Sequence, residues 1–208
     1  TVYSELAMPV SLESYRSVAE HMGYEGLPLS VCTDGNAQDG AEVVRRLTLN
    51  YADGAQAQEL GHQHVFSDGV FCPSYPALAA WLRRLSGLAS VGDLAAGAGT
   101  ARVFRNAEKW VIVMWADAAS TAISLPVGEA TAIVLEDAEG NPLETPAIDE
   151  QGRVTVNAGP SPRYLSGQGG EVLRQTAIRR ARGEATAFLG DGEMEGVLEG
   201  RLKPVLEK

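Results

Sequence analysis

The fold is decided by the stretch Lys109-Trp-Val-Ile-Val-Met-Trp115, in which every residue after Lys109 is apolar. A short apolar run without alternation predicts a strand over 110–116 that is buried on both faces. Other short segments around it are predicted as further strands, at 101–106, 121–125, 130–136 and 153–157. Because turn sequences separate these segments, they predict an antiparallel β-sandwich. We expect Gly159-Pro-Ser-Pro-Arg-Tyr164 to close it, since proline cannot continue a central strand.

The part of the chain before this stretch has helical periodicity instead. Apolar residues at helical spacing predict helices over 11–22, 39–51 and 75–85, the last with Leu78, Trp81, Leu82 and Leu85 on one face. Between them, 27–33 predicts a buried strand, and a further strand is expected within 52–65. Alternating helices and strands indicate an α/β region.

The predicted fold class is therefore α/β followed by all-β, with a helical tail. We divide the chain into residues 1–88, 89–166 and 167–208. The sequence starts at Thr1 without a methionine or signal peptide, and it stops at Lys208 inside a helical pattern. We therefore expect it to be part of a longer protein.

Composition narrows the classes of function. An apolar fraction of 45% with 21% charged residues is typical of a globular protein. The formal net charge of -10 argues against a nucleic-acid partner, which requires clustered Lys and Arg. No apolar run reaches the roughly 20 residues that cross a bilayer, so no membrane partner is expected. Neither a phosphate nor a dinucleotide fingerprint is present, and we predict no cofactor.

One family resemblance follows from the order of these segments. Leu27-Pro-Leu-Ser-Val-Cys-Thr33-Asp34-Gly35, the later Pro73-Ser-Tyr75 and the strand at 109–115 resemble the C-terminal part of clan-A glycoside hydrolases, of a bacterial type. In that family a (β/α)8 barrel is followed by a β-sandwich. The resemblance implies that residues 1–88 are the end of such a barrel. It also implies a carbohydrate ligand and a missing N-terminal barrel portion as partner.

The resemblance places Asp34 at the position of the catalytic nucleophile. The family has Glu there, and retaining glycosidases hold their two carboxyl groups about 5–5.5 Å apart, so the shorter Asp is a departure. The second carboxylate would stand on an earlier barrel strand outside this chain. Asp34-Gly-Asn36 is also a loop sequence, in which Asp34 would cap the following turn or helix. Both interpretations of Asp34 stay open.

Asn36, His62 and His64 are the candidate substrate-binding residues. By the resemblance, they line the sugar cleft beyond the ends of two barrel strands; the alternative is that they face water. His62 and His64 form an H-x-H pair, and zinc would need a third ligand such as Asp68. No other ligand is clustered with them, so we predict no metal site.

The three tryptophans have two interpretations as well. Flat indole rings suit stacking on sugars, but Trp81 lies on the apolar face of a predicted helix, and Trp110 and Trp115 bracket the most apolar strand. We therefore predict that all three are core residues. Since five positions separate Trp110 from Trp115, they should point to opposite faces of the strand.

The sequence thus predicts the C-terminal fragment of a glycoside hydrolase that acts on O-glycosidic bonds of a carbohydrate. We expect this fragment to be inactive by itself, because one carboxylate of the pair is missing. The alternative is a non-catalytic carbohydrate-associated or structural module derived from such an enzyme, and the Asp34 departure favours it.

Overall fold

The computed structural model describes residues 2–3, 30–33, 39–55, 57–60, 66–67, 70–94 and 96–169. Its first part is a three-stranded parallel sheet of order β1-β2-β3. The strands are β1 (Val2–Tyr3), β2 (Ser30–Thr33) and β3 (Ala57–Leu60). The helix α2 (Gly40–Ala52) connects β2 to β3, which makes a β-α-β unit and confirms an α/β region. The helix predicted over 11–22 lies outside the described residues, and so do residues 170–208 of the predicted helical tail.

The helix α2 begins where the sequence supplies a cap. The Asp39 carboxylate accepts a hydrogen bond of 2.9 Å from the N–H of Ala41, which has no partner inside the helix. The buried face of α2 is a stripe of four residues: Val43, Val44, Leu47 and Thr48. The predicted helix over 39–51 is therefore confirmed to within one residue.

The second helix, α3 (Tyr75–Leu85), has the predicted bounds. Pro76 fits its first turn, where no N–H is needed, and Arg83 and Arg84 lie in the last turn, next to the negative end of the helix dipole. The prediction that Leu82 belongs to the apolar face is wrong, because Leu82 is 53% exposed. The buried face is centred on Trp81, and the next residue lies about 100° further round the helix.

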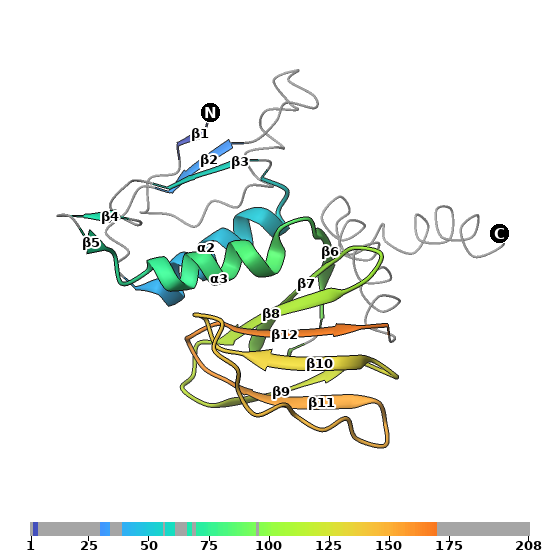
Figure 1. The fold of residues 1–208 in the computed structure, drawn as a ribbon. Helices are drawn as coiled ribbons and strands as arrows, with labels where there is room; N and C mark the ends of the chain where they lie inside the picture. The colour runs from blue at the N-terminus through green and yellow to red at the C-terminus, as the bar shows by residue number, and fades with distance from the viewer. Residues whose placement is uncertain are drawn as a thin grey trace, which may run out of the picture.

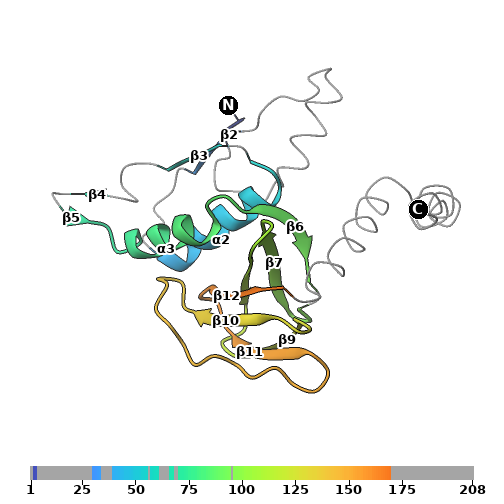
Figure 2. The ribbon, with the colours of Figure 1, turned by 45° about the vertical axis from the view of Figure 1, so that its right-hand side comes forward.

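A short hairpin precedes α3. It consists of β4 (Phe66–Ser67) and β5 (Val70–Phe71), which pair in antiparallel register. The sequence pattern did not predict these strands, since strands of two residues show no periodicity. The hairpin stands at one end of the helix pair in Figures 1 and 2.

All described strands from β6 onward pair in antiparallel fashion. They form a five-stranded sheet of order β10-β12-β8-β7-β6 and a two-stranded ladder of β11 with β9. Their bounds are β6 (Ala89–Asp93), β7 (Gly99–Arg105), β8 (Trp110–Ala116), β9 (Thr121–Pro126), β10 (Thr131–Glu136), β11 (Arg153–Ala158) and β12 (Arg163–Gln168). The strands predicted in this region are confirmed, together with their antiparallel pairing.

The strand β8 separates two apolar cores. Trp110, Ile112 and Met114 contribute to the inner core, which lies between the five-stranded sheet and the β9–β11 ladder. Val111, Val113 and Trp115 contribute to the interface core, where the sheet packs against α2 and α3. All seven residues of β8 are buried, which confirms the prediction made from its sequence. Figures 1 and 2 both show the helix pair between the parallel sheet and the five-stranded sheet.

Two strands of the five-stranded sheet were not predicted. β6 forms an edge, and its ladder with β7 is irregular between Ser90 and Gly92. β12 lies in the interior of the sheet between β10 and β8, so the expectation that 159–164 closes the antiparallel region is wrong. Pro160 and Pro162 precede the first residue of β12 and take no part in its ladders, so their missing N–H groups remove no ladder hydrogen bond.

The coarse fold class, α/β followed by mostly antiparallel β, is confirmed. That the parallel part is the end of a (β/α)8 barrel, and the antiparallel part its accessory sandwich, stays a prediction. Neither of the two helices in the described part of the chain is long and apolar enough to span a membrane.

Candidate functional site

The carboxyl ends of β2 and β3 define the candidate site. The two strands are parallel, and Thr33 at the end of β2 is in register with Leu60 at the end of β3. The strands therefore end level with each other at one edge of the sheet. In parallel α/β folds, ligands bind at this edge, because the loops that follow the strands meet there.

The four predicted site residues follow these two strand ends in the sequence. Asp34 and Asn36 come after Thr33, and His62 and His64 come after Leu60. All four lie outside the described residues, so their roles stay predictions. Among the side chains that the structure describes, no group of three His, Cys, Asp or Glu residues could hold a metal ion.

The starts of both helices lie close together. A methyl group added at Gly40, the first residue of α2, would lie 2.8 Å from the Cβ of Ala77 in the first turn of α3 and 3.5 Å from the Cα of Ser74. Only glycine allows this approach of the two helices. The N-terminus of a helix carries a partial positive charge, so this end of the helix pair favours carboxylates and hydroxyl oxygens.

An aromatic pair stands at the same end. The rings of Phe71 in β5 and Tyr75 at the start of α3 are stacked, with centroids 4.4 Å apart and planes inclined by 22°. Phe71 is 62% exposed, although Cys72 and Ser74, which lie between Phe71 and Tyr75 in the sequence, are buried. The sequence interpretation missed this pair, and the signal available was an aromatic pair flanking Pro73 between a strand and a helix.

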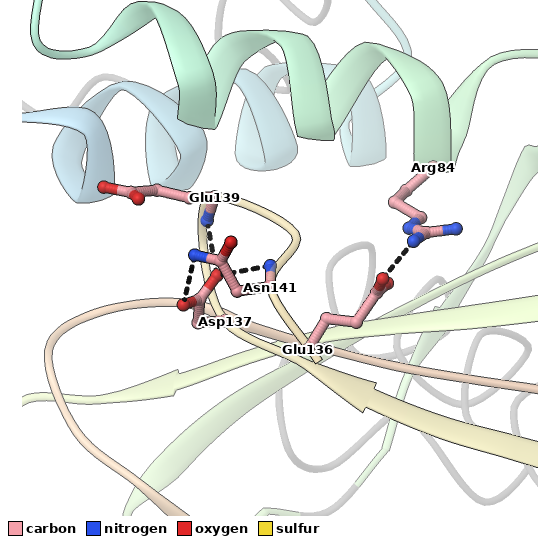
Figure 3. A network of polar contacts seen from close by, with 5 residues as sticks. All are labelled: Arg84, Glu136, Asp137, Glu139 and Asn141. Carbon is pink, nitrogen blue, oxygen red and sulfur yellow. Dashed lines mark hydrogen bonds and ion pairs between the residues drawn. The ribbon is translucent and has the colours of Figure 1, made fainter. Parts of the chain in front are cut away.

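A second group of carboxylates lies where β10 meets α3, as Figure 3 shows. Arg84 of α3 forms an ion pair with Glu136, the last residue of β10, which is only 4% exposed. The Asp137 carboxylate accepts three hydrogen bonds of 2.9 Å, from the backbone N–H groups of Glu139 and Asn141 and from Nδ2 of Asn141. The Asp137 carboxylate thus holds the turn itself, and Glu136 ties it to α3, so we assign this cluster to structure.

Contacts with α3 explain the shape of this turn. Gly140 has a φ of +83°, which favours glycine, and an added methyl group there would lie 3.2 Å from the Cβ of Ala80. Tyr164 of β12 is buried close by, and burial raises the pKa of its phenol, as does the charge of Glu136. The phenol is therefore neutral near pH 7 and serves as a packing residue.

The three tryptophans are core residues, as predicted. Trp81 donates from Nε1 to Oγ1 of Thr48 at 3.0 Å, and Trp110 donates from Nε1 to the carbonyl of Gly169 at 2.7 Å. Trp110 belongs to the inner core, whereas Trp81 and Trp115 belong to the interface core. Trp110 and Trp115 therefore point to opposite faces of β8, and none of the three indoles is available as a sugar platform.

Comparison with known proteins bears on the fold. No protein-family model and no curated protein matches the chain. Among solved structures, a family 39 glycoside hydrolase from the gut symbiont Bacteroides cellulosilyticus WH2 has a TM-score of 0.61 at 17% identity, over 74% of this chain and 37% of that one. A GH30 endoxylanase from Clostridium papyrosolvens C71 has a TM-score of 0.57 at 12% identity, over 78% and 47%.

A third solved structure is a family 44 xyloglucanase from Paenibacillus polymyxa, determined with xyloglucan. It has a TM-score of 0.51 at 10% identity, over 78% of this chain and 36% of that one. This chain spans less than half the length of each of the three. At such identities the likeness shows the fold alone. It agrees with the resemblance to clan-A glycoside hydrolases and fits the expected bacterial type.

Proposed function

We propose that this chain is the C-terminal part of a glycoside hydrolase that cleaves O-glycosidic bonds of a carbohydrate. The observation that carries the proposal is the likeness of its fold to glycoside hydrolases of three families, each longer than this chain. Residues 1–88 are then the end of a (β/α)8 barrel, 89–166 the accessory sandwich, whose last strand β12 extends to Gln168, and 167–208 a helical tail. The remaining barrel strands belong to the missing N-terminal portion.

The chemistry of such a hydrolase needs a pair of carboxyl groups that flank the scissile bond. One protonates the leaving oxygen, while the other attacks the sugar carbon or activates the water that does so. Asp34 is the candidate for the second role, because it follows directly after β2, the middle strand of the parallel sheet. The first carboxyl group comes from an earlier barrel strand, so this chain alone is inactive. The mechanism itself requires no cofactor and no metal.

Substrate binding is assigned to Asn36, His62 and His64. The level ends of β2 and β3 support this assignment, since the residues that follow both strands start from one edge of the sheet. Amide and imidazole groups donate and accept hydrogen bonds, which suits the hydroxyl groups of a neutral sugar. The acidic net charge of -10 also favours a neutral carbohydrate over a polyanion.

The test compares the wild type, Asp34→Ala and Asp34→Glu in the full-length protein, with aryl glycosides as substrates. If Asp34 is the attacking carboxylate, Asp34→Ala lowers kcat/KM by at least about 10²-fold, the lower end for a positioned acid or base. Asp34→Glu should retain more activity, since Glu is the residue of the family. Equal rates in all three proteins would remove Asp34 from the mechanism.

A second candidate function is a non-catalytic carbohydrate-associated or structural module. The Asp34 departure from the Glu of the family favours it, because a shorter carboxylate lies further from the sugar. Carbohydrate binding without hydrolysis, in the wild type and in Asp34→Glu alike, would support this second function over the first.

A further inference from the structure

The strand β10 lies at one edge of the five-stranded sheet, where β12 is its neighbour among the described strands. An edge strand presents N–H and C=O groups that can pair with the same edge of a second copy of the protein. The segment from Ala130 to Leu135 favours such pairing, because it contains no charge and no proline, and Thr131, Ile133 and Val134 are β-branched. Val134 is also 40% exposed. The composition of β10 therefore makes its open edge a place where copies of the protein can associate.

The second half of this edge is covered by the chain that follows β10. The N–H of Leu143 donates a hydrogen bond of 2.8 Å to the carbonyl of Leu135. Beside it, Pro142 forms an antiparallel bridge with Glu136. Within the described part of the chain, no such cover lies on the outer side of residues 131–134. The open length of the edge is therefore its first half.

A β-bulge lies in this open half. In the ladder with β12, Thr131 lies opposite Gln168, and the register then shifts, so that Val134 lies opposite Ser166. Two residues of β10 thus face one residue of β12, which bends the strand and strengthens its twist. Ala132 in the bulge has a φ of +52°, and it is the one non-glycine residue with positive φ in the described part of the chain. This left-handed conformation brings the Cβ of an L residue too close to its own backbone, so the bulge is kept in spite of an unfavourable geometry.

The inner core does not require the extra residue. Ala130 and Leu135 belong to the inner core, and Ile133 packs against it. Thr131 and Ala132 are neighbours in the sequence, and both are exposed. Without Ala132, buried and exposed positions would alternate from Ala130 to Leu135, as in a regular strand. The same core contacts could therefore be made by a straight edge strand.

We infer that the bulge at Ala132 prevents β10 from pairing with the same edge of a second copy of the protein. A bent edge cannot form the continuous ladder that two straight strands form. The opposite edge of the sheet is irregular as well, since the ladder of β6 with β7 shifts between Ser90 and Gly92, and Gly92 has a φ of +121°. The inference concerns the five-stranded sheet alone, so it is independent of the proposed function.

The test removes the bulge in the full-length protein and measures association by size-exclusion chromatography with light scattering. Deletion of Ala132 should leave a regular strand, and the variant should shift to larger species than the wild type forms at the same concentration. Ala132→Gly is the matched control, because glycine adopts a positive φ readily and keeps the bulge. It should elute as the wild type does, and its melting temperature should equal or exceed that of the wild type.

A rescue variant separates edge pairing from unfolding, which also causes association. Val134→Lys, added to the deletion of Ala132, places a charge on the open edge, where it opposes pairing between copies but does not repair an unfolded chain. Return to the elution of the wild type in this double variant supports the inference. Association that persists in the double variant, or a deletion variant that elutes as the wild type does, overturns it. Association of Ala132→Gly overturns it as well, because that variant keeps the bulge.

Discussion

The two cores on opposite sides of β8 differ in polarity. Among the described residues the buried polar side chains are Thr48 on α2, Ser74 at the start of α3 and Glu136 beside Arg84 of α3, all on the side of the helix pair. In the inner core, Trp110 donates to the carbonyl of Gly169. The interface core has polar contacts within it or at its margin, namely the bond from Trp81 to Thr48, the bond from the Tyr51 hydroxyl to the carbonyl of Leu88, and the Arg84–Glu136 pair.

The two cores differ in polarity because they join different kinds of elements. Strands of the inner core are already aligned by their ladders, so packing alone completes their arrangement. No backbone ladder joins the helix pair to the sheet, and apolar contacts by themselves allow helices to slide. A hydrogen bond or ion pair that forms in one position only fixes the register between layers. We therefore interpret the interface core as a contact specified by its polar groups.

The largest effect is expected in the inner core. Ile112→Ala should lower the free energy of unfolding by about 2–5 kcal/mol, because Ile112 is fully buried and a cavity would remain. Urea denaturation followed by circular dichroism measures this loss. Val134→Ala is the control, since Val134 is 40% exposed at the edge strand β10, and it should change stability by less than about 0.5 kcal/mol.

The neighbouring substitution Val113→Ala tests whether the cores are independent. Val113 faces the interface core, and it is as deeply buried as Ile112. A single cooperative transition that both substitutions shift means that the two cores unfold together. Two separate transitions, each moved by one substitution, would mean that the cores on either side of β8 are uncoupled.

A smaller effect is expected from the ion pair. Glu136→Gln should cost about 1–3 kcal/mol, because it weakens a charge-assisted bond to Arg84 in a buried place. The double variant Arg84→Met with Glu136→Leu should recover much of that loss, since apolar groups of similar volume often replace a buried pair at no cost. A double-mutant cycle of Arg84→Met, Glu136→Leu and the double variant measures the coupling between the two side chains. A coupling near zero would contradict the interpretation that the pair specifies the interface.

The smallest effect at neutral pH is expected from Tyr164→Phe. The Tyr164 hydroxyl is buried without a hydrogen-bond partner among the described residues, so its removal should change stability by less than about 1 kcal/mol at pH 7. The wild type should behave differently in alkali. Burial raises the pKa of Tyr164 above its ordinary value of 10.0, so above about pH 10 the unfolded state loses this proton first and stability falls.

The variant should lack this part of the alkaline decline. Chemical denaturation of wild type and Tyr164→Phe at pH 7 and pH 11 measures the difference. An equal loss of stability in both proteins between these pH values would show that the Tyr164 phenol does not control the interface core in alkali.

Local sequence patterns predicted the elements with strong periodicity. The strand at 110–116 and the helix at 75–85 were found at their observed bounds, because burial on both faces or along one stripe leaves a clear apolar pattern. β12 was missed although it lies in the interior of its sheet. Its sequence contains Ser166 and Gly167, and it owes its place to pairing with β8, which precedes it by a long connection. Such pairing leaves no local signal.

The candidate site was predictable to a lesser degree. The predicted order of the strands placed the candidate residues directly after two strands, and the parallel pairing of β2 with β3 agrees with that order. The Phe71–Tyr75 pair was not foreseen, because two aromatic residues on either side of a proline look the same whether buried or exposed. Exposure is set by the orientation of a two-residue hairpin, which periodicity does not report.

The place of β8 has a consequence for synthesis of the protein. Its interface partners in α2 and α3 are made before it, but its inner-core partners β9 and β11 and its neighbour β12 are made after it. β12 ends at Gln168 and β8 ends at Ala116, so the ribosome needs roughly 3–10 s to supply β12, the last of these three strands. During that interval Trp110, Ile112 and Met114 await their partners on the nascent chain. β8, which separates the two cores of the finished protein, thus lacks its inner-core partners for part of the time in which the protein is made.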